Sequence, residues 1–350
     1  MKKILVTGGT GYIGSHTIVD LLDNGYEVIS IDNLVNSDGS MLKGIKKITG
    51  KTVKNYKVDL TNLKATRKVF ERHPDIKGII HFAALKSVGE SVGEPLLYFK
   101  NNLEGLMNIL ICAKDYNVKN FIFSSSCTVY GNADELPVTE ETPQKEAESP
   151  YGRTKQIGEN IIKDFAKAYP DFKSILLRYF NPAGAHESAL IGEMSIKKAI
   201  YLVPVIMETA AGRRKETVVF GDTYDTRDGS CIRDYIHVMD VASAHTKSLE
   251  YLMDGKNESN CEVFNVGIGE GVSVLEAIHA FERVSAKKLN YRIGPPRDGD
   301  VIAIYSNYDK ARDKLGWKPK RSIDDIMKTA WAWEQVLLRN DELAPKSRIF

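Results

Sequence analysis

Short apolar runs alternate with amphipathic stretches through the first 180 residues of the chain. The apolar runs suit parallel strands that are buried on both faces, and the amphipathic stretches suit helices that cover such a sheet. The strands are expected at 4–6, 27–31, 53–58, 78–82, 121–123 and 173–178. The helices between them are expected at 15–22, 63–72, 95–116 and 151–169. This order predicts an α/β fold with a doubly wound parallel sheet.

Beyond residue 180 the regular alternation ends. Residues 182 to about 192 have the character of a loop, 196–212 are partly helical, and short strands are expected at 218–220 and 263–266. A helix is expected to run through residue 251 from the segment that begins at Arg233. We therefore predict a dinucleotide-binding domain at 1–180, with a return of the chain at about 235–265. A smaller C-terminal α/β substrate-binding lobe is predicted at 181–234 and 266–350.

Three glycines follow the first predicted strand, at Gly8, Gly11 and Gly14, and a helix follows them. Glycine permits a tight turn, lets the backbone approach a pyrophosphate, and places the helix N-terminus against the phosphates. Asp32 ends the second strand, 18 residues after Gly14. Its charge suits a ribose hydroxyl and repels a 2′-phosphate, which favours NAD over NADP. The alternative is a glycine-rich turn without a ligand, but the context predicts a Rossmann-type NAD site.

A second motif begins the helix at 151–169. Pro150 fits its first turn, and Tyr151 and Lys155 lie four residues apart on one face. A free phenol has a pKa of about 10, and a nearby cation favours the phenolate. The pair alone is equally consistent with a half-buried ring beside a solvated charge. However, Ser126 follows the strand at 121–123, and ligands of parallel sheets bind beyond that end. A plain strand-to-loop turn is the alternative for this serine.

Composition adds several exclusions. The 350 residues include 48 Lys and Arg against 46 Asp and Glu, a net charge of +2 that predicts no general attraction to nucleic acid or membrane. The four cysteines form no Cys-x-x-Cys pattern, and the seven histidines have no ligand spacing, so no metal site is expected. No apolar stretch reaches the length of a membrane span. Reduced thiols and a cytoplasmic location are expected.

The G-x-x-G-x-x-G spacing and the Tyr-x-x-x-Lys pair resemble the extended short-chain dehydrogenase/reductase family. Longer segments resemble its UDP-glucose 4-epimerase branch: TGGTGYIGSHT, HFAALKSVGESV, FSSSCTVYGN, SPYGRTK, LRYFNPAGAH, RDYIHVMD and PRDGD. The resemblance implies an enzyme that interconverts UDP-galactose and UDP-glucose with tightly bound NAD. The sugar is oxidised at carbon 4, the ketone turns over, and the hydride returns to its opposite face. The resemblance also implies a homodimer, with the helices at 95–116 and 151–169 as contact faces.

The resemblance further implies roles for individual residues. Tyr151 as phenolate removes the proton of the sugar 4-hydroxyl, Lys155 lowers the tyrosine pKa and holds the nicotinamide ribose, and Ser126 relays the proton. Sugar-nucleotide dehydratases place acidic residues where this chain has Cys127 and Thr128, so dehydration is disfavoured. The implied cofactor-binding residues are Gly8, Gly11, Tyr12, Ile13, Gly14, Asp32, Asn33, Asp59, Leu60, Phe82, Ala83, Ala84, Lys86, Asn101, Ser124, Tyr151, Lys155 and Phe180. The implied substrate-binding residues are Lys86, Ser126, Tyr151, Asn181, Leu202, Arg233, Tyr235, Arg297 and Asp300.

Two departures from the family pattern leave the sugar open. Tyr201 stands where the family has an asparagine that contacts the nucleotide phosphates, and 195–198 differ from the usual loop. Ile304 is intermediate in size where the family's residue admits or excludes N-acetylated sugars. The alternatives are a 4-epimerase for another UDP-sugar (N-acetylhexosamine or pentose), or a substrate-shifted variant. A non-enzyme alternative is an NAD-sensing protein of the same fold, against which Ser126, Tyr151 and Lys155 argue.

Overall fold

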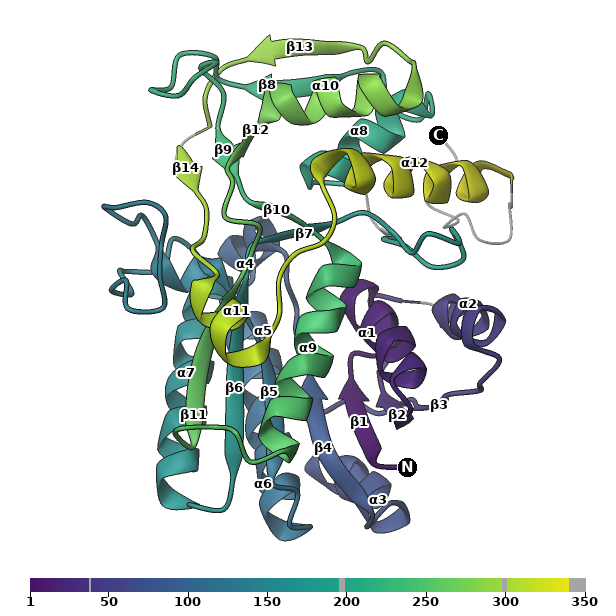
Figure 1. Ribbon diagram of the computed structural model, residues 1–350, viewed down its shortest axis with the longest axis vertical. Helices are drawn as coiled ribbons and strands as arrows, with labels where there is room; N and C mark the ends of the chain where they lie inside the picture. The colour runs from purple at the N-terminus through teal and green to yellow at the C-terminus, as the bar shows by residue number, and fades with distance from the viewer. Residues whose placement is uncertain (38, 195–198, 298–300, 340–350) are drawn as a thin grey trace.

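A seven-stranded parallel sheet forms the centre of the protein in the computed structural model, which describes residues 1–37, 39–194, 199–297 and 301–339 (Figure 1). The strand order is β11-β6-β5-β4-β1-β2-β3, and every neighbouring pair is parallel. The strands are β1 (Lys3–Thr7), β2 (Glu27–Ile31), β3 (Lys54–Tyr56), β4 (Ile76–His81), β5 (Asn120–Ser126), β6 (Lys173–Tyr179) and β11 (Cys261–Val266). The predicted α/β class with a doubly wound sheet is confirmed. Because the order reverses beside β1, ligands are expected at the carboxyl ends of β1 and β4.

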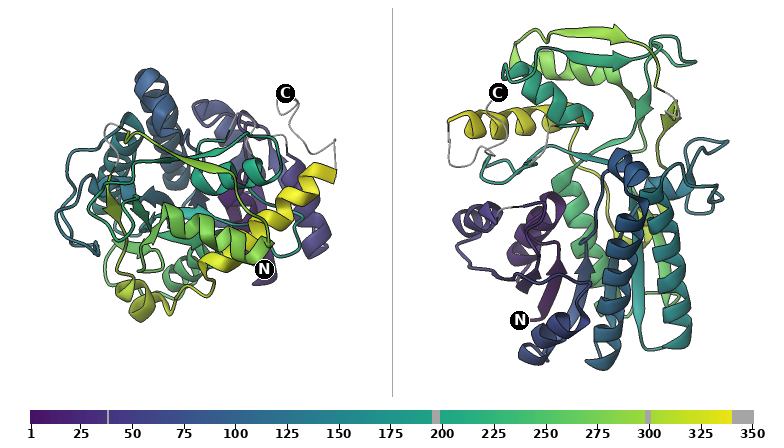
Figure 2. Two further views of the ribbon diagram at one scale, coloured as in Figure 1. Left: turned by 90° about the horizontal axis from the view of Figure 1, so that it is seen from above. Right: turned by 180° about the vertical axis from the view of Figure 1, so that it is seen from behind.

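Helices cover both faces of the sheet. On one face lie α1 (Tyr12–Asp23), α2 (Ser40–Thr49) and α9 (Val238–Met253); on the other lie α3 (Leu63–Arg72), α6 (Gly105–Asp115) and α7 (Pro150–Ala168). Figure 2 shows this second face from behind. Strand side chains alternate between the two layers, so Ile4 and Val6 join one core cluster and Leu5 joins the other. This two-sided burial explains why β1 is apolar throughout.

The segment at 95–116 differs from the single helix that its pattern predicts. It divides into α5 (Pro95–Phe99), a π-helical turn η1 (Lys100–Glu104) and α6. The π turn places Asn102 against the loop after β4, where its side chain accepts from the Leu85 amide at 2.8 Å and donates to the Leu85 carbonyl at 3.0 Å. It also donates to Thr154 Oγ1 at 3.1 Å. One side chain thus joins the β4 loop to α7.

The second lobe packs its helices against short strands (Figure 1). Its helices are α8 (Leu202–Ala210), α10 (Val274–Ser285) and α12 (Ile323–Arg339). Its strands are β8 (Thr217–Phe220), β9 (Ile232–Arg233), β12 (Val272–Ser273), β13 (Tyr291–Gly294) and β14 (Ala303–Ile304). The chain passes between the lobes through the paired strands β7 (Asn181–Ala183) and β10 (Tyr235–His237). The remaining short elements are α4 (Val88–Gly93), η2 (Cys127–Tyr130) and α11 (Asp309–Leu315).

Asp234 links several strand ends by hydrogen bonds at the junction of the two lobes. Its fully buried carboxylate accepts from the amides of Ile268 (2.8 Å), Gly269 (3.3 Å) and Ser306 (3.0 Å), and from Ser306 Oγ at 2.6 Å. Burial raises the pKa of Asp234, but these four donors lower it, and donors of this kind favour the carboxylate form. Asp234 lies between β9 and β10, and its bonds therefore fix both strands relative to β11 and β14.

We expect Asp234→Asn to lower the free energy of unfolding by about 2–3 kcal/mol, because an amide group would face donors with a donor of its own. Denaturant unfolding measures the loss. Asp222→Asn, the same change at an exposed aspartate in the loop after β8, should alter stability by less than about 0.5 kcal/mol. Equal stability of the two variants would contradict the role given to Asp234.

Candidate active site

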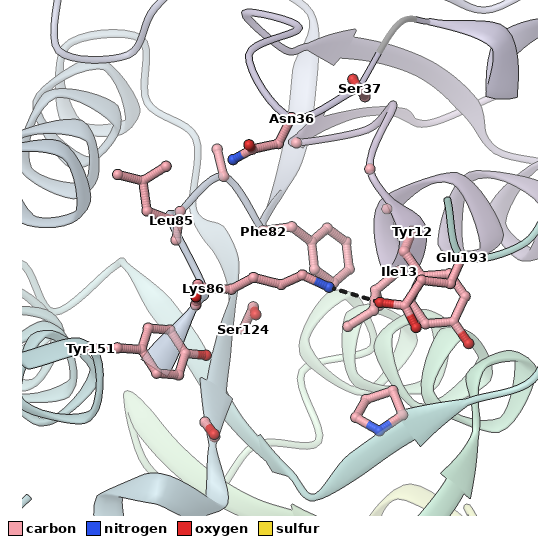
Figure 3. A pocket seen from close by; sticks show the side chains of 18 of the residues that line it. Tyr12, Ile13, Asn36, Ser37, Phe82, Leu85, Lys86, Ser124, Tyr151 and Glu193 are labelled. Atoms are coloured by element: carbon pink, nitrogen blue, oxygen red, sulfur yellow. Dashed lines mark hydrogen bonds and ion pairs between the residues drawn. The ribbon is translucent and has the colours of Figure 1, made fainter. Parts of the chain in front are cut away.

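A cavity of about 620 Å³ lies at the carboxyl ends of the central strands, between the sheet and the second lobe (Figure 3). All the residues predicted for the cofactor line it, as do Ser126, Asn181, Leu202 and Tyr235, which were predicted for the substrate. The predicted cofactor residues in its wall are Gly8, Gly11, Tyr12, Ile13, Gly14, Asp32, Asn33, Asp59, Leu60, Phe82, Ala83, Ala84, Lys86, Asn101, Ser124, Tyr151, Lys155 and Phe180. The fold thus brings residues from Gly8 to Tyr235 to one place.

The glycine loop is held by close backbone packing. Gly8 has φ +71°, and a Cβ there would lie 2.9 Å from the Ala83 amide nitrogen. A Cβ on Gly14 would lie 2.2 Å from the Gly8 carbonyl oxygen. Gly11 precedes α1 and contributes no side-chain cap to it. The first turn of α1 therefore presents backbone amides to the cavity, an arrangement that suits a phosphate.

Asp32 follows β2 and lies beside the glycine loop. Its carboxylate accepts from the Thr10 amide at 3.1 Å and from the Leu34 amide at 2.9 Å, which fixes it at the edge of the cavity. Ser37 Oγ contacts Thr10 Oγ1 at 2.6 Å and lines the cavity too, although the sequence had not marked it. A fixed carboxylate beside an amide-rich helix start fits the ribose and pyrophosphate of NAD.

Tyr151, Lys155 and Ser126 meet in the cavity wall. Ser149 caps α7 by accepting from the Gly152 amide at 3.1 Å, and this cap places Tyr151 in the first turn. Lys155 is buried, with Nζ donating to the Ser124 carbonyl oxygen at 2.7 Å and lying 5.7 Å from the Tyr151 ring centroid. The predicted trio is therefore assembled from the end of β5 and the start of α7.

The pKa values correct one expectation. Burial raises the pKa of Tyr151 well above its ordinary value, and the nearby Ser126 hydroxyl lowers it only in part. In the protein alone the pKa of Tyr151 is therefore shifted in the direction opposite to the predicted one. Burial also lowers the pKa of Lys155 itself, to about 8, while Glu159 opposes that change. The trio thus holds a neutral phenol beside a lysine that titrates near neutral pH.

Several cavity residues were missed. Tyr179 ends β6, and its hydroxyl contacts Ser124 Oγ. Tyr179 could have been predicted as a site residue, because ligands bind at the carboxyl ends of parallel strands. Its place within an apolar run favoured a core role instead. Glu193 pairs with Lys86 at 3.2 Å across the cavity (Figure 3). No local sequence pattern predicts a site role for Glu193, because it follows a loop without regular structure.

Lys86 and Tyr201 join the two lobes at the cavity. The Tyr201 hydroxyl donates to the Lys86 carbonyl oxygen at 3.2 Å, and its ring centroid lies 5.3 Å from Lys86 Nζ. The Tyr12 ring centroid lies 5.9 Å from the same ammonium. Lys86 is therefore surrounded by one carboxylate and two aromatic faces.

Two arginines predicted for the substrate are not placed in the cavity wall. Neither Arg233 nor Arg297 is among the cavity-lining residues that the structure describes. Arg233 donates to the Ile232 carbonyl at 2.9 Å, and the Arg297 guanidinium lies 4.5 Å from the Phe220 ring centroid. Asp300 and residues 195–198 lie outside the described residues, so their predicted roles are not placed. Ile304 is buried in a cluster with Cys127.

The remaining expectations concern metals and membranes. Within the described ranges, no group of three or more His, Cys, Asp or Glu side chains could hold a metal ion. The same ranges contain no helix that combines the length and the apolar character needed to cross a membrane. The cysteines at 112, 127, 231 and 261 are all free thiols.

Comparison with known proteins gives the family. A family model described as GDP-mannose 4,6 dehydratase matches residues 5–330. The UDP-glucose 4-epimerase of Schizosaccharomyces pombe is 46% identical over 336 residues, 95% of this chain and 94% of that protein. The enzyme of Bacillus subtilis is 44% identical, over 95% of this chain and 96% of its own length. This chain belongs to the UDP-glucose 4-epimerase family.

A solved structure agrees with this assignment. The Bifidobacterium longum UDP-glucose 4-epimerase in complex with NAD⁺ and UDP is 44% identical and superimposes with a TM-score of 0.90, covering 95% of this chain and 98% of that one. The family resemblance in the sequence is thereby confirmed. The matching family model carries a dehydratase's name, so the residues that separate the two reactions matter.

Cys127 and Thr128 separate an epimerase from a dehydratase here. Both line the cavity directly after Ser126, at the place expected to carry acids in a dehydratase. Burial raises the pKa of the Cys127 thiol to about 12, which leaves it a neutral thiol near neutral pH. A buried neutral thiol and a hydroxyl are poor general acids for eliminating water. The cavity therefore favours the epimerase reaction.

Proposed function

We propose that the protein interconverts UDP-galactose and UDP-glucose by transient oxidation at sugar carbon 4. The observation that carries this proposal is the meeting of Ser126, Tyr151 and Lys155 in one cavity with the glycine loop. A hydroxyl relay, a phenol and a cation are the groups that an alcohol oxidation needs beside a nicotinamide. The glycine loop and Asp32 would hold NAD, which would supply the hydride acceptor and donor for sugar carbon 4.

The chain's own residues handle the proton. Ser126 lies beside Tyr151 in the cavity wall, so a proton taken from a sugar hydroxyl can pass between the two oxygens. Lys155 is fixed by the Ser124 carbonyl, with its charge beside the tyrosine ring. Because burial alone disfavours the phenolate, the tyrosine needs added positive charge to act as a base. Lys155 supplies part of that charge.

Binding of the nucleotide portion rests on residues from both lobes. Asn181, Leu202 and Tyr235 lie in the cavity wall and are proposed to hold UDP. Arg233 and Arg297 remain predictions for the same role, and Arg297 would have to leave its position over Phe220. The free thiols of the described residues are consistent with a cytoplasmic enzyme, which also remains a prediction.

We expect Tyr151→Phe to lower turnover by about a hundredfold to ten-thousandfold, because the phenolic proton acceptor is removed. NAD should remain bound at wild-type stoichiometry, measured by absorbance after denaturation. Turnover is measured on a panel of UDP-sugars. Tyr251→Phe is the matched control, since Tyr251 is buried on α9 and bonds Glu262 instead. Near-normal turnover of Tyr151→Phe would exclude the mechanism, and wild-type protein that holds NAD but converts no sugar would favour the sensing alternative.

A shifted substrate is the second candidate, and Tyr201 favours it. Its hydroxyl and ring are engaged with Lys86 at the junction of the lobes, where the family pattern places a smaller asparagine. A ring there narrows the space between the β4 loop and α8. UDP-sugars of another shape, pentose or N-acetylhexosamine, would be affected differently from UDP-galactose.

We expect Tyr201→Asn to lower KM for UDP-galactose by about two- to tenfold, the worth of one restored hydrogen bond. Initial rates on UDP-galactose, a UDP-pentose and a UDP-N-acetylhexosamine measure the effect. Tyr201→Phe keeps the ring over Lys86 and loses only the hydroxyl, so it should retain the wild-type order of preference. An unchanged KM in Tyr201→Asn would argue that position 201 does not select the substrate.

The homodimer is proposed from exposed apolar side chains on the predicted contact segment at 95–116. Those on α5 and α6 are Leu96, Leu97 and Met107, and Val88 and Val92 lie on the preceding α4, outside the predicted segments. Leu96 is 81% exposed, a costly position for leucine in water unless another chain covers it. The patch adjoins α7, which packs against α4 and α5.

We expect Leu96→Asp to shift the protein from dimer to monomer in sedimentation equilibrium, because a buried unpaired carboxylate opposes association. Leu338→Asp is the matched control, a leucine of α12 that is 45% exposed and lies outside the patch. A wild-type monomer, or dissociation by the control alone, would contradict the proposed interface.

A further inference from the structure

A buried ion pair lies directly behind the catalytic trio. Glu159 of α7 is 0% exposed and Arg178 of β6 is 3% exposed. Arg178 donates Nε to Glu159 Oε1 at 2.9 Å and Nη2 to Oε2 at 2.7 Å, a forked geometry. Such a pair contributes little net stability compared with apolar residues of the same size, because both charges must be desolvated. Its presence in the core therefore calls for another explanation.

The pair is part of a fully hydrogen-bonded network. Ser125 Oγ donates to Glu159 Oε1 at 2.6 Å, and Gln144 Nε2 donates to Oε2 at 2.7 Å. Arg178 Nη1 donates to the Tyr130 hydroxyl at 3.1 Å. The network thus joins α7, β5, β6 and the loop that carries Gln144. A shared carboxylate fixes these segments more firmly than separate neutral bonds would.

Ser125 links the network to the reaction. It is the middle of three successive strand residues, between Ser124 and Ser126. The Ser124 carbonyl holds Lys155 Nζ at 2.7 Å, and Ser126 lines the cavity beside Tyr151. Side chains alternate along a strand, so the side chains of Ser124 and Ser126 point to the face opposite Ser125. Because the three residues share one backbone, a bond that fixes Ser125 also restrains the Ser124 carbonyl and the Ser126 hydroxyl. Glu159 therefore constrains both predicted partners of the tyrosine.

Glu159 also supplies the charge that faces Lys155. The two residues lie one turn apart on the same face of α7. The other titratable groups near the ammonium are neutral, because burial lowers the pKa of His81 on β4 to about 3 and raises the pKa values of Tyr151 and Tyr179. Arg178 on β6 offsets part of the Glu159 charge, as does Lys163 on α7, whose Nζ lies 3.7 Å from Glu159 Oε2. Glu159 is the group whose charge raises the pKa of Lys155 against burial.

We propose that Glu159 and Arg178 are positioning residues of the epimerase, which hold the Ser124–Ser126 strand end through Ser125 and keep a counter-charge behind Lys155. Neither touches the reacting atoms. The inference rests on the proposed epimerase function, which the wild-type assay tests separately.

Two variants of the holoenzyme test the proposal. Ser125→Ala removes one donor but leaves the ion pair, and kcat should fall about tenfold with KM and NAD content unchanged. Ser174→Ala is its matched control, a fully buried serine on β6 that bonds the Asn260 carbonyl at 3.2 Å. The control should keep wild-type kcat.

Glu159→Gln tests the charge. Loss of the carboxylate makes protonated Lys155 less favourable, so the pKa of Lys155 falls and the alkaline limb of the kcat profile moves about one unit to lower pH. Circular dichroism establishes that the variant is folded; if it is not, Ser125→Ala decides alone. Wild-type kcat in Ser125→Ala, or an unmoved alkaline limb in folded Glu159→Gln, overturns the proposal. Absence of activity in the wild type would instead reject the proposed function.

Discussion

Two-sided burial of the parallel sheet is the constraint from which the rest of the structure follows. Helices cover both faces, so strand side chains in the middle of the sheet have no access to solvent. Polar chemistry is then confined to the carboxyl ends of the strands. The glycine loop after β1, Ala83 and Ala84 after β4, the serines of β5 and Tyr179 of β6 all stand at this edge. The active site is therefore placed by the topology before any individual side chain is considered.

At that edge, close backbone packing shapes one end of the cavity, and buried titratable groups determine the chemistry of the other end. Gly8 and Gly14 let three backbone segments approach to distances that any side chain would prevent. That packing forms the phosphate end of the cavity. At the other end, electrostatics dominate, since burial raises the pKa of Tyr151 and lowers that of Lys155. Nearby charges are therefore needed to lower the pKa of Tyr151 and to raise that of Lys155.

Much of the fold could be read from the sequence where local pattern and tertiary burial agree. The strand at 27–31 and the helix at 63–72 have their predicted bounds, because each carries a strong apolar period. The π turn at 100–104 could not be predicted from the sequence. It changes the backbone hydrogen bonds from the i→i+4 to the i→i+5 pattern and leaves the order of apolar residues almost unchanged. The predicted trio met as expected, because its members sit at strand and helix ends. Glu193 was missed because it lies in an irregular loop, which carries no apolar period from which a direction can be inferred. Arg233 and Arg297 are not in the cavity wall among the described residues, so their role stays a prediction.

The position of β11 has a consequence for how this chain could be divided. The strand at one edge of the central sheet is formed by residues 261–266, after much of the second lobe has been traversed. A fragment that stopped near residue 180 would leave β6 as an open edge, with unpaired backbone groups ready to join another chain. It would also lack α9, which packs against α1. Exchange of substrate lobes between relatives therefore requires two junctions, one on each side of the returning segment, rather than a single fusion point.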